Sequence, residues 1–217
     1  MKTYQDFFPL VYPDVPGVTP DMATQAIQNT VIEFCEKSLI HQVTLDPLTL
    51  IENVDTYDLE PDGDVRVTKI MRVWFRGTEL SPLAPDDIAT PDPYNTIIGD
   101  YQVEKAEPRG YTQRDEEGTI TFTPMPNQRY QNAITMRVAL VPLRSATQIP
   151  DFLLETWGEI ISFGAKARLQ VNPGKPYTNV EAAQINQARF FAGLNDARQR
   201  AVRGNVRSTL TVQMRKI

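Results

Sequence analysis

The grouped carboxylates of this sequence are its first candidates for a metal-binding or catalytic site. They gather in three short runs, which are Glu60/Asp62/Asp64, Asp86-Asp87 and Asp115-Glu116-Glu117. Grouped carboxylates can bind calcium, but a calcium-binding loop needs a ligand spacing that none of these runs has. Each run also lies beside proline or glycine, where aspartate favours a turn. We therefore interpret the runs as solvated turns and predict no metal site.

Other residue types that often do chemistry are scarce. The single cysteine, Cys35, lies on a helical apolar pattern, which predicts a buried structural thiol. With His41 as the single histidine, the sequence lacks the ligands of the usual zinc sites, and a histidine-based catalytic triad is not expected. Asn172-Pro173-Gly174-Lys175 follows a predicted helix and lacks the spacing of a phosphate-binding loop. We predict that the protein is not an enzyme and has no cofactor.

The charge of the chain is distributed unevenly. The net charge is −5, but residues 1–147 hold 12 basic and 22 acidic side chains, whereas residues 148–217 hold 10 and 5. After Asp196 every charged residue is basic: Arg198, Arg200, Arg203, Arg207, Arg215 and Lys216. A bipolar chain suits ordered contacts between copies or with a partner. Solvated helix faces and a loose basic tail are the alternative interpretation.

Nothing in the sequence indicates a membrane partner. No stretch approaches the ~20 consecutive apolar residues that a spanning helix needs. Met1–Asp6 lacks the basic and then apolar regions of a secretory signal. We expect a soluble chain that is made in a cytoplasm. Its 217 residues are enough for one large domain or two small ones.

Helical periodicity occurs near both ends. Thr19 is the predicted N-cap of a first helix, with Pro20 at its first position and apolar residues recurring to Leu39. Periodicity returns at Asp151 and continues to Leu169, where we expect close approach of another helix at Gly164-Ala165. Thr178-Asn179-Val180-Glu181 predicts a capping box for a last helix, which Gly204 ends.

The period changes to two between His41 and Thr147. Val65–Arg76 is the longest strand candidate, with Val65, Val67, Lys69, Met71, Val73 and Phe75 expected on one face. Pro82–Pro93 is too rich in proline for a central strand. About six strands at this spacing suggest a small antiparallel sandwich or barrel.

These patterns predict an α+β protein. Residues 1–40 and 148–204 are expected to form a helical bundle built from both ends of the chain. Residues 41–147 are expected to be an inserted antiparallel β-sandwich or barrel-like module. Residues 205–217 are expected to be an extended C-terminal arm, because Ser208–Ile217 alternates polar and apolar residues and can pair with another protein by β-augmentation. A disordered tail is the alternative.

Motifs at opposite ends of the chain resemble one known family. Tyr12–Gly17 (YPDVPG) runs through Thr19-Pro20 into the first helix. Ile149–Leu153 (IPDFL) is followed by Gly164–Leu169 (GAKARL) and Asn172–Tyr177 (NPGKPY). The chain resembles the head-to-tail adaptor proteins of tailed bacteriophages, also called connector or neck proteins, which stack as a ring beneath the portal.

The resemblance implies a structural protein of the virion, located at the head–tail junction. It implies a homo-oligomeric ring, usually of twelve copies, that binds the portal protein and offers an attachment surface to tail or nozzle proteins. Genomic DNA would pass through the lumen without sequence-specific binding. We assign portal docking to Arg203, Arg207, Leu210, Val212, Met214, Arg215, Lys216 and Ile217. We assign subunit packing to Tyr12, Trp157, Gly164, Ala165, Phe190 and Phe191.

Two other functions stay open at this point. The arginine-rich C-terminal helix could contact DNA phosphates, which would make the protein a nucleic-acid-binding module. Aromatic residues are not interleaved with these arginines, and the chain as a whole is acidic, so carboxylates on a partner protein are the simpler target. The chain could also be a different ring component of the same virion, in head completion or in the tail tube.

Overall fold

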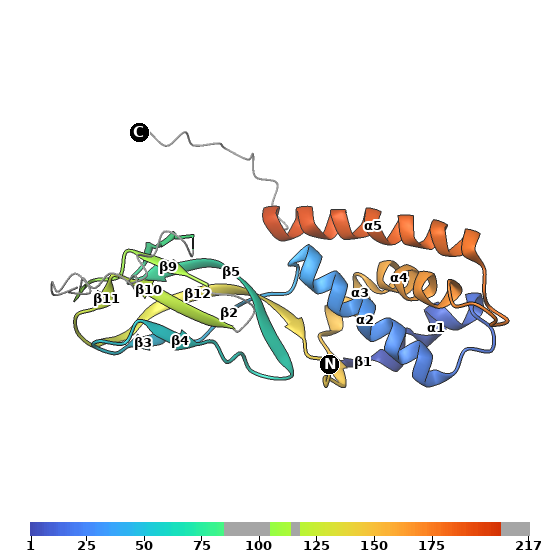
Figure 1. The fold of residues 1–217 in the computed structure, drawn as a ribbon, viewed down its shortest axis with the longest axis horizontal. Helices are drawn as coiled ribbons and strands as arrows, with labels where there is room; N and C mark the ends of the chain where they lie inside the picture. Colours follow the sequence, from blue (N-terminus) through green and yellow to red (C-terminus); the bar gives the residue numbers. More distant parts are fainter. Residues whose placement is uncertain (85–104, 114–117, 205–217) are drawn as a thin grey trace, which may run out of the picture. The chain divides into compact units, whose positions relative to one another are not determined.

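The computed structural model describes residues 1–84, 105–113 and 118–204. Within these residues the chain forms two compact units. One unit comprises Met1–Ile40 together with the segment that begins at Thr147, and the other comprises His41–Ala146 (Figure 1).

The first unit is mostly helical but also contains a short sheet. Its two strands, β1 and β13, pair antiparallel, with Lys2 opposite Ile149. The elements of this unit are β1 (Lys2–Thr3), the 3-10 helix η1 (Tyr4–Phe7), α1 (Phe8–Val11), the 3-10 helix η2 (Tyr12–Asp14), α2 (Pro20–Ser38), β13 (Gln148–Ile149), α3 (Asp151–Glu155), α4 (Gly158–Gln170) and α5 (Val180–Arg203).

Helix α2 begins where its sequence predicts. Thr19 has extended backbone, and its Oγ1 accepts a hydrogen bond from the Met22 amide at 3.5 Å, which confirms it as the N-cap. The helix ends at Leu39, whose φ of 55° is left-handed. Its buried residues recur at helical spacing: Ala23, Ala26, Ile27, Thr30, Val31, Ile32, Phe34, Cys35 and Ser38.

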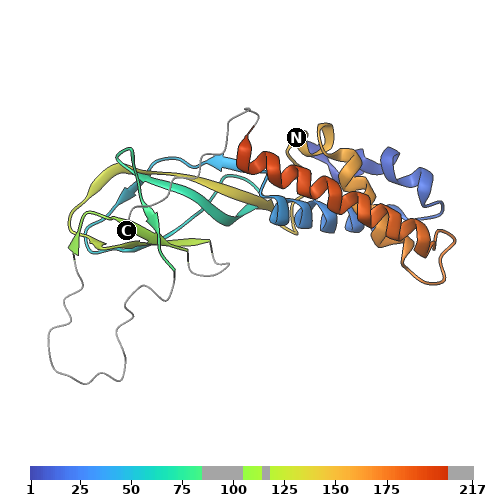
Figure 2. The same ribbon diagram turned by 90° about the horizontal axis from the view of Figure 1, so that it is seen from above.

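Helix α4 lies at the centre of this unit and contacts α1, α2 and α5. Figure 2 shows α5 lying along these helices. A Cβ atom on Gly164 would lie 2.5 Å from Thr30 Cγ2 in α2 and 2.8 Å from Phe190 Cδ2 in α5. A Cβ atom on Gly193 in α5 would lie 2.5 Å from Ile160 Cγ2 in α4. Both glycines are therefore required by helix packing, and the close approach predicted at Gly164 is confirmed.

Two helix boundaries differ from prediction. The helix expected from Asp151 to Leu169 is interrupted, because Trp157 has a non-helical backbone (φ −118°, ψ 4°) between α3 and α4. The N-cap of α5 is Asn179, whose side chain accepts from the Ala182 amide at 3.0 Å, so the predicted capping box is wrong by one residue. Thr178 instead accepts from the Lys175 amide at 3.1 Å, which closes the preceding turn.

The second unit consists of short strands around one long antiparallel pair. Its strands are β2 (Gln42–Thr44), β3 (Leu48–Leu50), β4 (Thr56–Asp58), β5 (Val65–Phe75), β6 (Thr78–Glu79), β7 (Ser81–Pro82), β8 (Lys105–Ala106), β9 (Gly110–Thr112), β10 (Thr119–Thr123), β11 (Met125–Pro126) and β12 (Tyr130–Pro142). The order β2-β12-β5-β6 forms one sheet, with β3 also on β12, and the order β4-β10-β9-β7 forms another. Strands β8 and β11 form a small parallel pair.

The long pair β5–β12 contains irregularities that move its buried face. The register with β12 shifts between Lys69 and Val67 and again between Arg72 and Ile70. Each β-bulge adds one residue to β5, so the buried side chains are Val67, Ile70, Val73 and Phe75. The prediction of one uninterrupted alternating face is therefore wrong, and Lys69 is exposed.

The described residues of the second unit share a hydrophobic core. It is formed by side chains from both larger sheets, with Phe75 and Tyr130 in an edge-to-face contact at 5.1 Å between ring centres. The buried members include Leu50, Val67, Ile70, Val73, Phe75, Leu80, Tyr111, Ile120, Phe122, Tyr130, Ile134, Met136, Val138 and Leu140.

The fold class predicted from the sequence is wrong. The structure is mixed α/β, with about 40% helix and 29% strand, and it has several sheets, one of which curls into a half-barrel. The expected purely helical bundle from both ends of the chain is not shown, since the helices of the first unit are accompanied by the β1–β13 sheet. Residues 41–146 are not one antiparallel sandwich, because β7 pairs with β9 and β8 with β11 in parallel. Hydrophobic periodicity predicts strands but does not say which strands pair.

Candidate functional site

Motif residues from the two ends of the chain meet in an ion pair. Asp14 ends η2, and Lys166 lies in the centre of α4. Lys166 Nζ donates a hydrogen bond to Asp14 Oδ2 at 2.8 Å, although the two residues are 152 positions apart in the sequence. The Lys166 side chain is only 8% exposed, whereas that of Asp14 is 54% exposed. A lysine buried to this degree needs a partner for its charge, and Asp14 supplies it.

A chain of buried amides joins the same loop to α5. Gln170, in the last turn of α4, donates through Nε2 to the Asp14 carbonyl oxygen at 3.3 Å. Its Oε1 accepts from Asn186 Nδ2 of α5 at 2.9 Å. Gln170 and Asn186 are both buried. We call the residues Asp14, Lys166, Gln170 and Asn186 the Asp14 junction, since their bonds tie the N-terminal turn to two helices from the other end of the chain.

The turns on either side of this junction also touch each other. Gly17 has a positive φ of 83°, and a Cβ atom on it would lie 3.3 Å from Pro176 Cγ. Tyr177, which follows Pro176, is buried and donates its hydroxyl to Met22 Sδ at 3.7 Å. The Tyr12–Gly17 and Asn172–Tyr177 motifs therefore lie against each other at the start of α2.

Aromatic rings line the helices around the junction. Lys166 Nζ lies 4.7 Å from the centre of the Phe163 ring, and the Arg189 guanidinium lies 5.2 Å from the same ring. Phe34 contacts both Trp157 and Phe190, with ring centres 5.5 Å and 6.3 Å apart. A cation over an aromatic face and a tilted pair of aromatic rings both stabilise packing, so these contacts help to hold the helices together.

The residues assigned to subunit packing divide into two groups. Trp157, Gly164, Ala165 and Phe190 are buried inside the first unit of the single chain. Tyr12 is half-buried and stacks on Phe8, with ring centres 4.6 Å apart. Phe191 is 39% exposed. The assignment to subunit packing stays a prediction, and Phe191 and Tyr12 have the surface to support it.

Portal-docking residues lie mostly outside the described part of the chain. Arg203 is the last residue of α5 and is exposed. Arg207, Leu210, Val212, Met214, Arg215, Lys216 and Ile217, and with them the predicted arm 205–217, lie outside the described residues. Their assignment stays a prediction.

Neither family models nor curated proteins match this chain.

The residues first considered for chemistry are dispersed. Glu60, Asp62 and Asp64 are exposed between β4 and β5, and the other two carboxylate runs lie outside the described residues. Among residues 1–84, 105–113 and 118–204, no group of three His, Cys, Asp or Glu side chains could hold a metal ion. Cys35 is fully buried, as predicted, and burial raises the pKa of its thiol to about 12. Burial lowers the pKa of His41.

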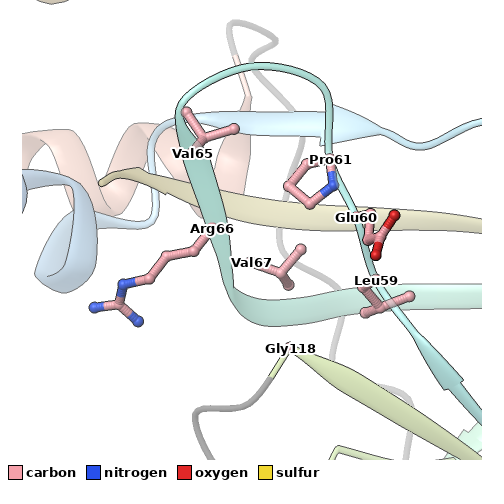
Figure 3. A pocket seen from close by; sticks show the side chains of 7 residues that line it. All are labelled: Leu59, Glu60, Pro61, Val65, Arg66, Val67 and Gly118. Atoms are coloured by element: carbon pink, nitrogen blue, oxygen red, sulfur yellow. The ribbon is translucent and has the colours of Figure 1, made fainter. Parts of the chain in front are cut away.

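A small open pocket lies in the second unit. It has a volume of about 280 Å³ and is lined by Leu59, Glu60, Pro61, Val65, Arg66, Val67 and Gly118 (Figure 3). The lining is mainly apolar, and Glu60 is its one carboxylate. The residues that line it do not include a pair of a nucleophile and a base.

Sequence reasoning did not find the Asp14 junction. A signal for it was present, since Lys166 stands among small apolar residues in Gly164–Leu169, on a helix predicted to be apolar around much of its surface. A charged residue in such a position needs a buried partner. The identity of that partner depends on the fold of a segment that lies about 150 residues earlier.

No helix in the described part of the chain is both long and apolar enough to cross a bilayer.

Proposed function

We propose that this protein is a non-enzymatic structural component of a tailed bacteriophage, an adaptor that docks under the portal and offers an attachment surface to tail proteins. One observation carries the proposal. The motifs that resemble the adaptor family, Tyr12–Gly17, Gly164–Leu169 and Asn172–Tyr177, contact one another through Lys166–Asp14 and Gly17–Pro176. Residues that depend on each other across the fold are the ones that a family resemblance should preserve.

The outer face of α5 supports assembly with neighbouring copies. The helix buries one face, formed by Ala183, Asn186, Phe190, Gly193, Leu194 and Ala197. Large apolar side chains also stay exposed along its length: Val180, Ile185, Phe191 and Val202. Val180, Phe191 and Val202 follow one another at intervals of eleven residues and so lie on one side of the helix, whereas Ile185 lies on another side. An apolar stripe of this kind suits a protein–protein contact. In the proposed ring, usually of twelve copies, this face would pack against the next subunit.

The end of α5 supports attachment to an acidic partner. Arg198, Arg200 and Arg203 are all exposed there, and residues 205–217 add further basic side chains in sequence. Cations are favourable at the C-terminus of a helix because the helix dipole is negative there. This basic end and the segment that follows it would bind carboxylates on the portal.

The test is reconstitution with the portal protein of the same virus, followed by electron microscopy. The full chain is expected to add a ring beneath the portal. A chain without residues 205–217 is expected to fold but not to attach, and Arg203→Ala/Arg207→Ala is expected to weaken attachment. Arg109→Ala/Arg129→Ala, which removes the same charge from the second unit, serves as the matched control. Normal attachment of the truncated chain would contradict the proposal.

The same variants separate this function from nucleic-acid binding. A DNA-binding module would bind duplex DNA with an affinity that falls steeply with salt, and it would lose that binding when residues 198–217 are removed. The adaptor predicts weak, salt-sensitive contact with DNA that does not depend on this segment. Tight DNA binding without portal attachment would favour the nucleic-acid function.

A further inference from the structure

Two apolar surfaces of the first unit are exposed, and they lie on different helices. The Phe191 face is on α5, where Phe191 is 39% exposed and Val180 lies exposed on the same side of the helix. The Leu10 face is formed by α1 and η2, where Leu10 is 39% exposed and Phe8 stacks on the half-buried Tyr12. Helices α1 and α5 both pack on α4, which lies between them in Figure 1. The first unit therefore presents two distinct apolar faces.

Cations border the Phe191 face. Lys37 Nζ of α2 lies 5.6 Å from the centre of the Phe191 ring, and the Lys37 side chain is 52% exposed. Lys37 shares the carboxylate of Glu33 with Arg168 of α4, whose side chain is 43% exposed. Two exposed cations thus share one carboxylate, which leaves this border with a net positive charge. Such a border favours an acidic partner surface.

Carboxylates border the Leu10 face. A Cβ atom on Gly158 would lie 3.4 Å from Leu10 Cδ1, which places this face beside the junction of α3 and α4. The segment Asp151–Glu159 spans that junction and contains three carboxylates and no basic residue. Two of them, Glu155 and Glu159, are exposed on either side of Gly158 in the sequence. The Leu10 face therefore has an acidic border, opposite in sign to the border of the Phe191 face.

We propose that the Phe191 face of one copy of this chain packs against the Leu10 face of the next copy. Both faces are apolar at the centre and they are opposite in charge at the border, so each matches the other better than it matches itself. A contact between two different faces is heterologous, and repeating it gives a closed ring or an open filament. The inference rests on the proposed function, because it names the surfaces that would join neighbouring subunits of the ring.

The test uses the full chain without portal protein, so that portal attachment plays no part in it. Sedimentation velocity at concentrations up to about 1 mM is expected to show association that weakens as salt rises. Phe191→Asp and Leu10→Asp each place a charge on one face, and each variant alone is expected to stay monomeric, with circular dichroism confirming that it is folded. A parent chain that is monomeric throughout would overturn the proposal.

Matched controls place the same charge elsewhere. Ile185→Asp changes an exposed apolar residue on another side of α5, and Val43→Asp changes one of similar exposure to Leu10 in the second unit. Both control variants are expected to associate as the parent chain does. Equal loss of association in the controls would overturn the proposal, because any added charge would then have the same effect.

A mixture of the two face variants tests whether the contact joins different faces. Phe191→Asp keeps an intact Leu10 face, and Leu10→Asp keeps an intact Phe191 face. An equimolar mixture is therefore expected to form a dimer and nothing larger. Dimers formed by either variant alone would overturn the proposal, since one face would then pair with itself.

Charge reversal tests the two borders. Lys37→Glu/Arg168→Glu and Glu155→Lys/Glu159→Lys are each expected to weaken association at least about tenfold at low salt, because like charges then face each other. Mixing these two variants restores opposite charges at every contact and is expected to recover assembly. A mixture that associates no better than its components would overturn the proposal.

A chain without residues 205–217 tests another occupant of the Phe191 face. It is expected to associate as the parent chain does, and loss of association would overturn the proposal, since the C-terminal segment of a second copy would then make the contact. Association between the two faces in a chain that does not attach to the portal would support this inference while contradicting the adaptor function.

Discussion

Lys166 of α4 and Asp14 of η2 form an ion pair at 2.8 Å in which the lysine is buried and the aspartate is half exposed. Removing one partner is therefore expected to have a different energetic cost from removing the other. Without Asp14, a positive charge stays buried without its partner, whereas without Lys166 the aspartate is solvated by water. The pair therefore holds the N-terminal turn in place because the buried Lys166 needs the carboxylate of Asp14.

This asymmetry predicts unequal effects of two substitutions. Asp14→Ala is expected to lower the free energy of unfolding by about 1.5–3 kcal/mol, the range for losing a hydrogen bond to a charged group. Lys166→Met, which keeps an unbranched apolar stem of similar volume, is expected to cost less than half as much. Urea unfolding followed by circular dichroism measures both. Equal losses would show that the burial of Lys166 does not determine the energetics.

The crossing of α4 with α2 and α5 predicts a steric effect at Gly164. Gly164→Ala places a methyl group 2.5 Å from Thr30 Cγ2 and 2.8 Å from Phe190 Cδ2, so it is expected to destabilise by about 1–3 kcal/mol. Gly158→Ala in the same helix serves as the control, since its nearest contacts are 3.3 Å and 3.4 Å. Thermal unfolding of both variants makes the comparison.

A second substitution tests whether the steric clash is the cause. Thr30→Ser removes the clashing methyl group but keeps the hydroxyl that donates to the Ala26 carbonyl oxygen at 2.8 Å. In the Gly164→Ala background it should recover part of the lost stability, because the contact with Phe190 remains. If Thr30→Ser recovered none of the lost stability, the clash with Thr30 would not be the cause of the loss.

The hydrogen bond from the Ile70 amide to Gln113 is expected to stabilise β5. Gln113→Leu removes the acceptor of the Ile70 amide, and a half-buried donor without an acceptor is expected to cost about 1–3 kcal/mol. The exposed Gln128→Leu is the control for the change in side-chain type. Hydrogen exchange resolves the effect, since the Ile70 amide should exchange faster in Gln113→Leu alone. Unchanged protection of Ile70 would contradict the role of this bond.

The thiol of Cys35 predicts a loss of stability at alkaline pH. Burial raises its pKa from 9.0 to about 12, so between these values the unfolded chain releases a proton that the folded chain retains. Stability from this group is fully present below pH 9 and falls as pH rises towards 12, by up to about 1.4 kcal/mol per pH unit.

Cys35→Ala isolates this contribution. The variant loses packing at every pH, but its deficit relative to the parent chain should shrink between pH 9 and pH 10. Burial also raises the pKa of Tyr57 and Tyr111, and these groups are present in both chains, so they cancel in the comparison. Tyr4 does not cancel fully, because the charge of Cys35 adds to the effect of burial in raising the pKa of Tyr4. A deficit that is constant with pH would rule out the buried thiol as the source.

Local features of the sequence determined several elements correctly. The Thr19 cap followed by Pro20 set the start of α2, and the apolar spacing in that helix predicted that Cys35 is buried. The glycine at position 164 indicated a close helix contact. These predictions succeed because capping, periodicity and backbone freedom act within a few residues of the chain.

Tertiary structure decided what depends on distant partners. Bulges in β5 moved Lys69 off the predicted face, and Asn179 displaced Thr178 as a cap because Thr178 bonds within the preceding turn. Strand pairing assembled several sheets where the alternating pattern suggested one sandwich. The partners of Lys166 and Gln170 came from a turn at the other end of the chain. Periodicity specifies which face of an element is apolar, but only packing specifies what that face meets.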